Sequence, residues 1–290
     1  MTLAGLLVPG SSGAQPDASA SAVQFGDPPA PLDRRRELAV ARGLAARLPE
    51  ARVVGADDAK AGPVLVIAAD PRDRRGSVIL VGPAGFALGE HALEAALTET
   101  LVVAGFDGYV VQAPLPPPGR RAALSGDAEW STLLEARVAA ACRAVVHAEQ
   151  PVFVVVVGTD MNLALPALDA VGAGPQMLKL AALVGIDAVP GRTGAAGEAE
   201  PAPGPSSIAE TLAARAVPLM LVTTFAAPRA PEFTVARELA ARQRSPRTVS
   251  LPELGPRRTG LETGLVQRVL GFFHHVLEPE DGDSVRAASG

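Results

Sequence analysis

The stretch PVFVVVVGTDMNLAL, from Pro151 to Leu165, decides the fold that the sequence predicts. It contains four consecutive valines and then a glycine followed by polar residues. An apolar run of this length that ends at a turn is typical of a strand buried on both faces of a sheet. Asp160 stands in the turn, so the chemistry of that position is the first functional question.

Strands and helices alternate on both sides of this stretch. Short strands at 51–57, 63–70 and 76–82 are separated by turns and are predicted to form an antiparallel lead-in. Further strands are expected at 106–116, 152–157, 180–189, 217–224 and 247–251. Helical spacing predicts helices at 32–48, 90–104, 128–147, 163–171, 206–215, 231–243 and 261–277. This alternation predicts an α/β fold with a mostly parallel central sheet, antiparallel N-terminal strands and helices on both faces.

The composition excludes several classes of protein. The net charge of −5 over 290 residues argues against a nucleic-acid partner, because phosphate recognition requires a basic face. No apolar run reaches the roughly 18 residues of a membrane-spanning helix, so no integral membrane segment is expected. The single cysteine, Cys142, excludes an internal disulfide and a cysteine-based zinc site, and we interpret it as a small core residue. Neither a metal nor a cofactor is predicted.

The chain is predicted to form one domain between two tails. The domain covers 32–278, and 279–290 is expected to be a disordered C-terminal tail. Residues 1–31 contain a short apolar stretch and a Pro-rich linker, so they are either a disordered tail or a signal region whose start lies upstream. The first alternative leaves the protein cytoplasmic, and the second, which we favour, makes it periplasmic or secreted.

Three stretches and the order of the elements carry a resemblance to a known superfamily. The stretches are SVILVGPAGF (77–86), VVVVGTDMN (154–162) and VSLPELGPRRTGLETGLVQRVLGFF (249–273). With the alternation described above they resemble the α/β-hydrolase superfamily, and they are similar to an uncharacterised, commonly secreted proteobacterial branch of it. The resemblance implies an oxyanion loop at Gly82 and Pro83. It implies a nucleophile elbow made of Gly158, Thr159, Asp160, Met161 and Asn162.

The catalytic positions that the resemblance implies all depart from the family pattern. Asp160 replaces the usual serine, and Asn162 replaces the second glycine of the elbow. The loop after the last strand has Pro256 or Arg257 where the family has its histidine. The segment 225–229 lacks the aspartate that would orient that histidine, and we interpret the four histidines, His91, His147, His274 and His275, as surface residues. The sequence therefore favours a catalytically inactive hydrolase fold that acts by binding or as a structural partner. The alternative is a weak or unorthodox hydrolase of an ester or related bond that uses Asp160 as nucleophile or base.

Several arginines are expected at the carboxyl edge of the sheet, where open parallel sheets bind their ligands. They include Arg120, Arg121, Arg257 and Arg258. Three interpretations stay open for them: solvated loop residues, an ion pair between Arg257 and Asp160 that closes the site, or a site for a carboxylate or phosphate group. The partner is accordingly an unknown protein or a small anionic ligand.

Overall fold

The computed structural model describes the parts of the chain that form the sheet and four helices. The described residues are 33–55, 62–83, 85–115, 128–147, 149–158, 178–186, 218–222, 249–250 and 261–278. The predicted helices at 163–171, 206–215 and 231–243 lie outside these ranges, as do the two predicted tails. All described residues belong to one compact unit that spans Pro31–Gly290.

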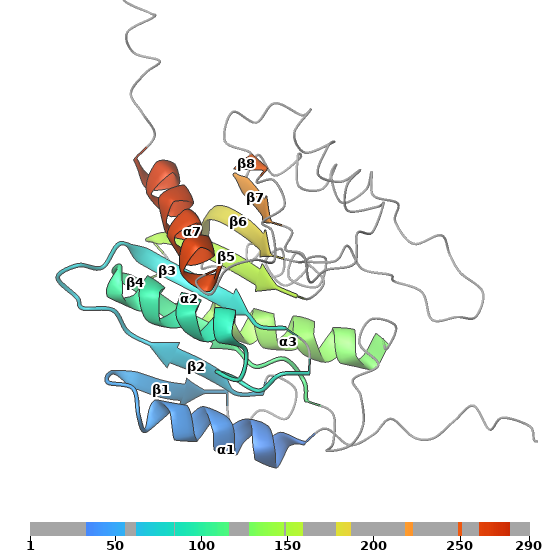
Figure 1. The fold of residues 1–290 in the computed structure, drawn as a ribbon. Coiled ribbons are helices and arrows are strands. Elements are labelled where there is room, and N and C mark those ends of the chain that lie inside the picture. The colour runs from blue at the N-terminus through green and yellow to red at the C-terminus, as the bar shows by residue number, and fades with distance from the viewer. Residues whose placement is uncertain are drawn as a thin grey trace, which may run out of the picture. The chain divides into compact units, whose positions relative to one another are not determined.

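The strands form one eight-stranded sheet with the order β1-β2-β4-β3-β5-β6-β7-β8 (Figure 1). Their bounds are β1 Ala51–Val54, β2 Val64–Ile67, β3 Gly76–Val81, β4 Phe106–Val111, β5 Pro151–Val157, β6 Lys179–Ile186, β7 Leu219–Val222 and β8 Val249–Ser250. Strand β2 runs antiparallel to β1 and β4, whereas all the remaining neighbours are parallel. This order confirms the predicted α/β-hydrolase-like architecture.

The predicted antiparallel lead-in is correct for β1 and β2 but wrong for β3. Strand β2 pairs with β4, and β3 lies parallel between β4 and β5. Asp107, the second residue of β4 and 4% exposed, joins β4 to the segment between β2 and β3. Its Oδ1 accepts the Ala69 N–H at 2.8 Å, and its Oδ2 lies 3.0 Å from Arg74 Nε in the turn before β3. These contacts hold the end of β2 beside β4, and the helix between β3 and β4 makes the crossover that leaves β3 parallel to β4.

The helices cover both faces of the sheet (Figure 1). Their bounds are α1 Arg34–Ala45, α2 Ala92–Val103, α3 Ala128–Ala144 and α7 Leu261–Leu277, and each falls within or on a predicted helical range. Apolar residues of α3 pack in one core cluster, and those of α1, α2 and α7 pack in another on the opposite face. In the described ranges no helix combines the length and the apolarity that a bilayer crossing requires.

The central strands are as deeply buried as the opening stretch predicts. Every residue of β3 is buried, and in β5 only Pro151 is partly exposed. A core with few aromatic residues nevertheless contains an aromatic cluster: the Phe153 and Phe273 rings stack at 4.0 Å, and Phe106 meets both of them edge-on. Cys142 is 1% exposed inside the α3 cluster, and burial raises the pKa of its thiol to about 12. The interpretation of Cys142 as a core residue is therefore confirmed.

Candidate functional site

The carboxyl edge of the sheet brings together three of the predicted site residues. Gly82 and Pro83 follow β3 directly, and Gly158 follows the neighbouring strand β5. The other predicted site residues lie outside the described ranges: Thr159, Asp160, Met161, Asn162, Arg120, Arg121, Arg257 and Arg258. The described part of the site thus consists of the two residues that follow β3 and the first residue of the predicted elbow.

Gly158 is fixed between the two neighbouring segments of the edge. Its φ of 58° lies in the left-handed region, which a residue with a Cβ rarely adopts. Its N–H donates to the Ile186 carbonyl at 2.8 Å and so extends the β5–β6 ladder beyond the end of β5. A Cβ at this position would lie 3.0 Å from Pro83 Cβ. The turn after β5 therefore packs closely on the buried Pro83.

The backbone amides of residues 87–90 are all used inside the protein. The Ala87 N–H donates to Glu90 Oε2 at 2.9 Å, and the Glu90 N–H donates back to the Ala87 carbonyl at 3.0 Å. The Leu88 N–H donates to Gln112 Oε1 at 2.9 Å, and the Gly89 N–H donates to Glu94 Oε1 at 3.1 Å. Pro83, which has no N–H, contributes no donor at all. These amides hold the segment 85–91, which we call the β3–α2 loop, in one shape.

Glu94 is a buried carboxyl group in the first turn of α2. The residue is 2% exposed, and its Oε2 occupies the space where a side chain at Gly82 would begin. Burial raises the pKa of the Glu94 carboxyl to about 7; the bond from the Gly89 N–H lowers it in part, and the negative charge of Glu90 raises it further. Glu94 therefore exchanges its proton near neutral pH, directly behind the predicted oxyanion loop.

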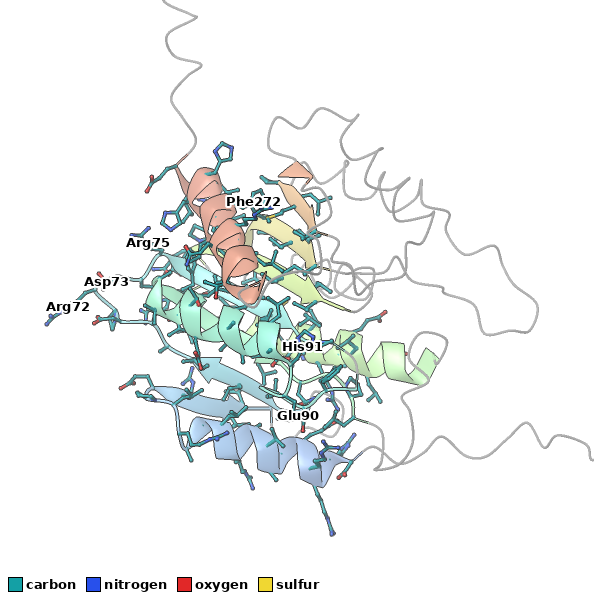
Figure 2. All side chains as sticks on the ribbon, viewed as in Figure 1. Arg72, Asp73, Arg75, Glu90, His91 and Phe272 are labelled. Atoms are coloured by element: carbon teal, nitrogen blue, oxygen red, sulfur yellow. The ribbon has the colours of Figure 1, made fainter. Side chains whose placement is uncertain are left out.

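Glu90 connects the same loop to α1. Its Oε1 accepts a hydrogen bond from Arg36 Nη2 at 2.9 Å, and both side chains are partly exposed. Figure 2 shows Glu90 between the ribbons of α1 and α2. The bond from the Ala87 N–H and the nearby Arg36 hold the pKa of Glu90 below its usual value. The next residue, His91, contacts the half-exposed Phe86 ring edge-on, with the two ring centroids 5.2 Å apart. The outer side of the loop thus presents an ion pair and an aromatic pair.

A second buried acid, Glu37 of α1, supports the segment after β4. Glu37 and Arg137 of α3 are both fully buried, with Oε2 and Nη2 2.9 Å apart. Glu37 Oε1 accepts the Leu115 N–H at 2.7 Å, and Arg137 Nη1 donates to the Gln112 carbonyl at 2.7 Å. The pair holds the backbone of Gln112, whose side-chain amide in turn donates to the Phe86 carbonyl at 3.1 Å. It therefore indirectly supports the β3–α2 loop.

The histidines do not meet at this edge in the described part of the chain. His91 belongs to the β3–α2 loop, and His147 bonds through Nε2 to Arg74 Nη1 at 2.9 Å, near the start of β4. His274 and His275 lie in the last turn of α7. His275 is exposed, as the interpretation of the histidines as surface residues predicts, whereas His91, His147 and His274 are half-buried. Within the described ranges, no group of three or more potential ligand residues could hold a metal ion.

Four buried residues of this region were not among the predicted site residues: Glu94, Gln112, Glu37 and Arg137. One pattern could have found Glu94: it stands four residues after Glu90, and two like charges at this spacing repel on a helix. Such a pair indicates that one carboxyl is neutral or bound elsewhere. Arg137 stands in the apolar stretch ARVAAAC, where a charged residue requires a buried partner.

No family model and no curated protein sequence matches the chain. Among solved structures, the chain is similar to TT1662 from Thermus thermophilus, with 18% identity and a TM-score of 0.50 over 79% of this chain and 98% of that one. An α/β serine hydrolase without a lid from Xanthomonas campestris has 14% identity and a TM-score of 0.49, over 80% and 95% of the two chains. Naproxen esterase from Bacillus subtilis has 12% identity and a TM-score of 0.46, over 84% and 100%. At these identities the likeness concerns the fold alone.

Proposed function

We propose that this protein has an α/β-hydrolase fold without hydrolase activity and that it acts by binding at the carboxyl edge of its sheet. The observation that carries the proposal is that the amides of residues 87–90 are occupied and that Pro83 has no N–H. A hydrolase of this fold needs an N–H from this loop to stabilise the oxyanion of the tetrahedral intermediate. Here the amides of residues 87–90 bond within the protein, and Pro83 has none.

The sequence supports the same conclusion from the other catalytic positions. Asp160 replaces the serine, and no histidine stands in the loop 251–260 after the last strand. A carboxylate nucleophile forms an ester that only a base-activated water can hydrolyse, so turnover would stall without that base. The lack of the serine and the lack of the histidine each lower the rate, and the loss of an oxyanion donor lowers it by a further ~10²–10³-fold.

The test compares the release of p-nitrophenol from p-nitrophenyl acetate and butyrate by three purified proteins. They are the parent, Asp160→Ala and the control Asp187→Ala, which removes the carboxylate that follows β6 in the sequence. We expect no rate above the buffer blank in any of them. Hydrolysis by the parent and the control that is lost in Asp160→Ala would refute the proposal and establish the alternative hydrolase.

The ligand that we propose for this edge is a small anion held by the predicted arginines. Planar guanidinium groups bind carboxylates and phosphates in pairs of hydrogen bonds. We expect phosphate or citrate to raise the melting temperature of the parent relative to chloride at equal ionic strength. The rise should be smaller in Arg257→Ala and unchanged in Arg268→Ala, which removes an exposed arginine of α7. An equal rise in all three proteins would leave a protein partner as the proposed occupant.

A further inference from the structure

The β3–α2 loop is wrapped around one ionisable group. Glu94 accepts the Gly89 N–H from one side, and its Oε2 fills the space above Gly82 on the other. Gly89 lies within the loop and Gly82 precedes it, so a change in the state of Glu94 acts on the loop and on the end of β3. Because Glu94 is only 2% exposed, water does not solvate its carboxylate while the loop keeps this shape.

The charges around Glu94 oppose its ionisation. Among the described residues, the charge that acts on it is that of Glu90, and it is repulsive. Arg36 of α1 binds Glu90 rather than Glu94, and the Gln112 amide after β4 is neutral. The neighbouring strand β3 and the buried side of α7, with Leu265, Val266 and Val269, contribute apolar groups to the shared core. Arg36, the cation that α1 brings to this loop, is therefore engaged with Glu90 and does not offset the charge of ionised Glu94.

We propose that Glu94 is a positioning residue whose bound proton keeps the β3–α2 loop closed, so that acid favours the closed loop and alkali releases it. The inference rests on the proposed binding function in one respect only: if a ligand binds at the carboxyl edge of the sheet, its binding depends on pH. The loop movement itself is independent of any ligand.

The sign and size of the effect follow from linkage. In the closed loop the pKa of Glu94 is raised to about 7 from 4.5, the value that it approaches when an open loop admits water. The closed form binds more protons between these two values, so its advantage is complete below about pH 4.5 and is lost as the pH rises through 7. A difference of this size corresponds to a change of roughly 300-fold in the ratio of open to closed loop.

The test follows the Gly89 amide by ¹H–¹⁵N NMR between pH 5 and 9 in the full chain. Its N–H donates directly to Glu94, so its chemical shift reports the protonation of that carboxyl. The second readout is the hydrogen-exchange rate of the Leu88 and Gly89 amides, expressed as the ratio of parent to Glu94→Gln at each pH, which cancels the intrinsic effect of pH on exchange. Glu99→Gln serves as the matched control, because Glu99 is an exposed glutamate of the same helix.

We expect the Gly89 shift to titrate near pH 7 in the parent and in Glu99→Gln but not in Glu94→Gln. The exchange ratio should be near one at pH 5 and rise by one to two orders of magnitude by pH 8.5. In Glu90→Gln the midpoint should fall, because the repelling charge is gone, and this variant keeps the test decisive if Glu94→Gln does not fold. A Gly89 midpoint that persists in Glu94→Gln, or an exchange ratio that does not change with pH, would overturn the inference. None of these readouts depends on ester hydrolysis, so failure here and failure of the proposed function are separate results.

Discussion

Removing either member of the buried pair formed by Glu37 and Arg137 leaves a charge in the interior without its counterion. Both residues are 0% exposed, and their charged atoms lie 2.9 Å apart. Breaking such a pair by replacing one partner costs about 3–5 kcal/mol, because the remaining ion keeps its full desolvation penalty. We therefore expect Glu37→Leu and Arg137→Met each to lower the free energy of unfolding by about that amount.

The double variant Glu37→Leu/Arg137→Met should cost much less than the sum of the two. It removes both ions, and similar apolar volume replaces them. What remains is the loss of a partner for the Leu115 N–H and for the Gln112 carbonyl, which we put at about 2 kcal/mol together. The coupling energy in the double-mutant cycle should thus be at least about 3 kcal/mol.

Urea denaturation at pH 7, followed by far-UV circular dichroism, measures the free energy of unfolding of the parent, the two single variants and the double variant. Arg36→Met is the matched control, because its ion pair with Glu90 is about 40% exposed on both sides. Exposed pairs contribute about 0–1 kcal/mol, so this variant should stay close to the parent. Two results would contradict a buried ion pair. In the first, the double variant loses as much free energy of unfolding as the two single variants together; in the second, each single variant loses no more than Arg36→Met.

Three further predictions concern packing. Gly82→Ala places a methyl group against the Glu94 carboxylate and should lower stability by about 1–3 kcal/mol; a melting temperature equal to that of the parent would contradict the contact. Phe273→Ala removes a ring stacked at 4.0 Å on Phe153 and should cost about 3–5 kcal/mol in urea denaturation, whereas a loss below ~1 kcal/mol would mean that the aromatic cluster is not packed as described. The Cys142 thiol, 1% exposed and with its pKa raised to about 12 by burial, should react with Ellman's reagent only in urea. Prompt reaction in native buffer would place it outside the core.

The strands and helices could be predicted because their apolar periodicity is strong and local. The buried run of β5 and the helical spacing of α7 need no information from the rest of the chain. The pairing of β2 with β4 could not be predicted in this way, because β3 and α2 lie between the two strands in the chain. Contacts of this kind join residues far apart in sequence, and hydropathy does not encode them.

The candidate site likewise contains residues that the sequence could predict and residues that it could not. Gly82, Pro83 and Gly158 could be placed at one edge because each follows a strand of a parallel sheet. The roles of Glu94 and Gln112 could not be assigned, because the spacing of Glu90 and Glu94 indicates only that one carboxyl is neutral or bound elsewhere, and a glutamine after a strand is an ordinary surface residue in most proteins. Their function comes from burial, which only the assembled core determines.

The bond between Glu37 and Arg137 also bears on the order in which the chain assembles during its synthesis. The two residues are separated by 100 positions, and a ribosome needs about 5–20 s to make that length of chain. Until Arg137 emerges, docking α1 would bury the carboxylate of Glu37 alone, which is unfavourable. The N-terminal helix should therefore remain undocked while β1 to β4 are made, and it should close onto the sheet only when α3 supplies its cation from the other face.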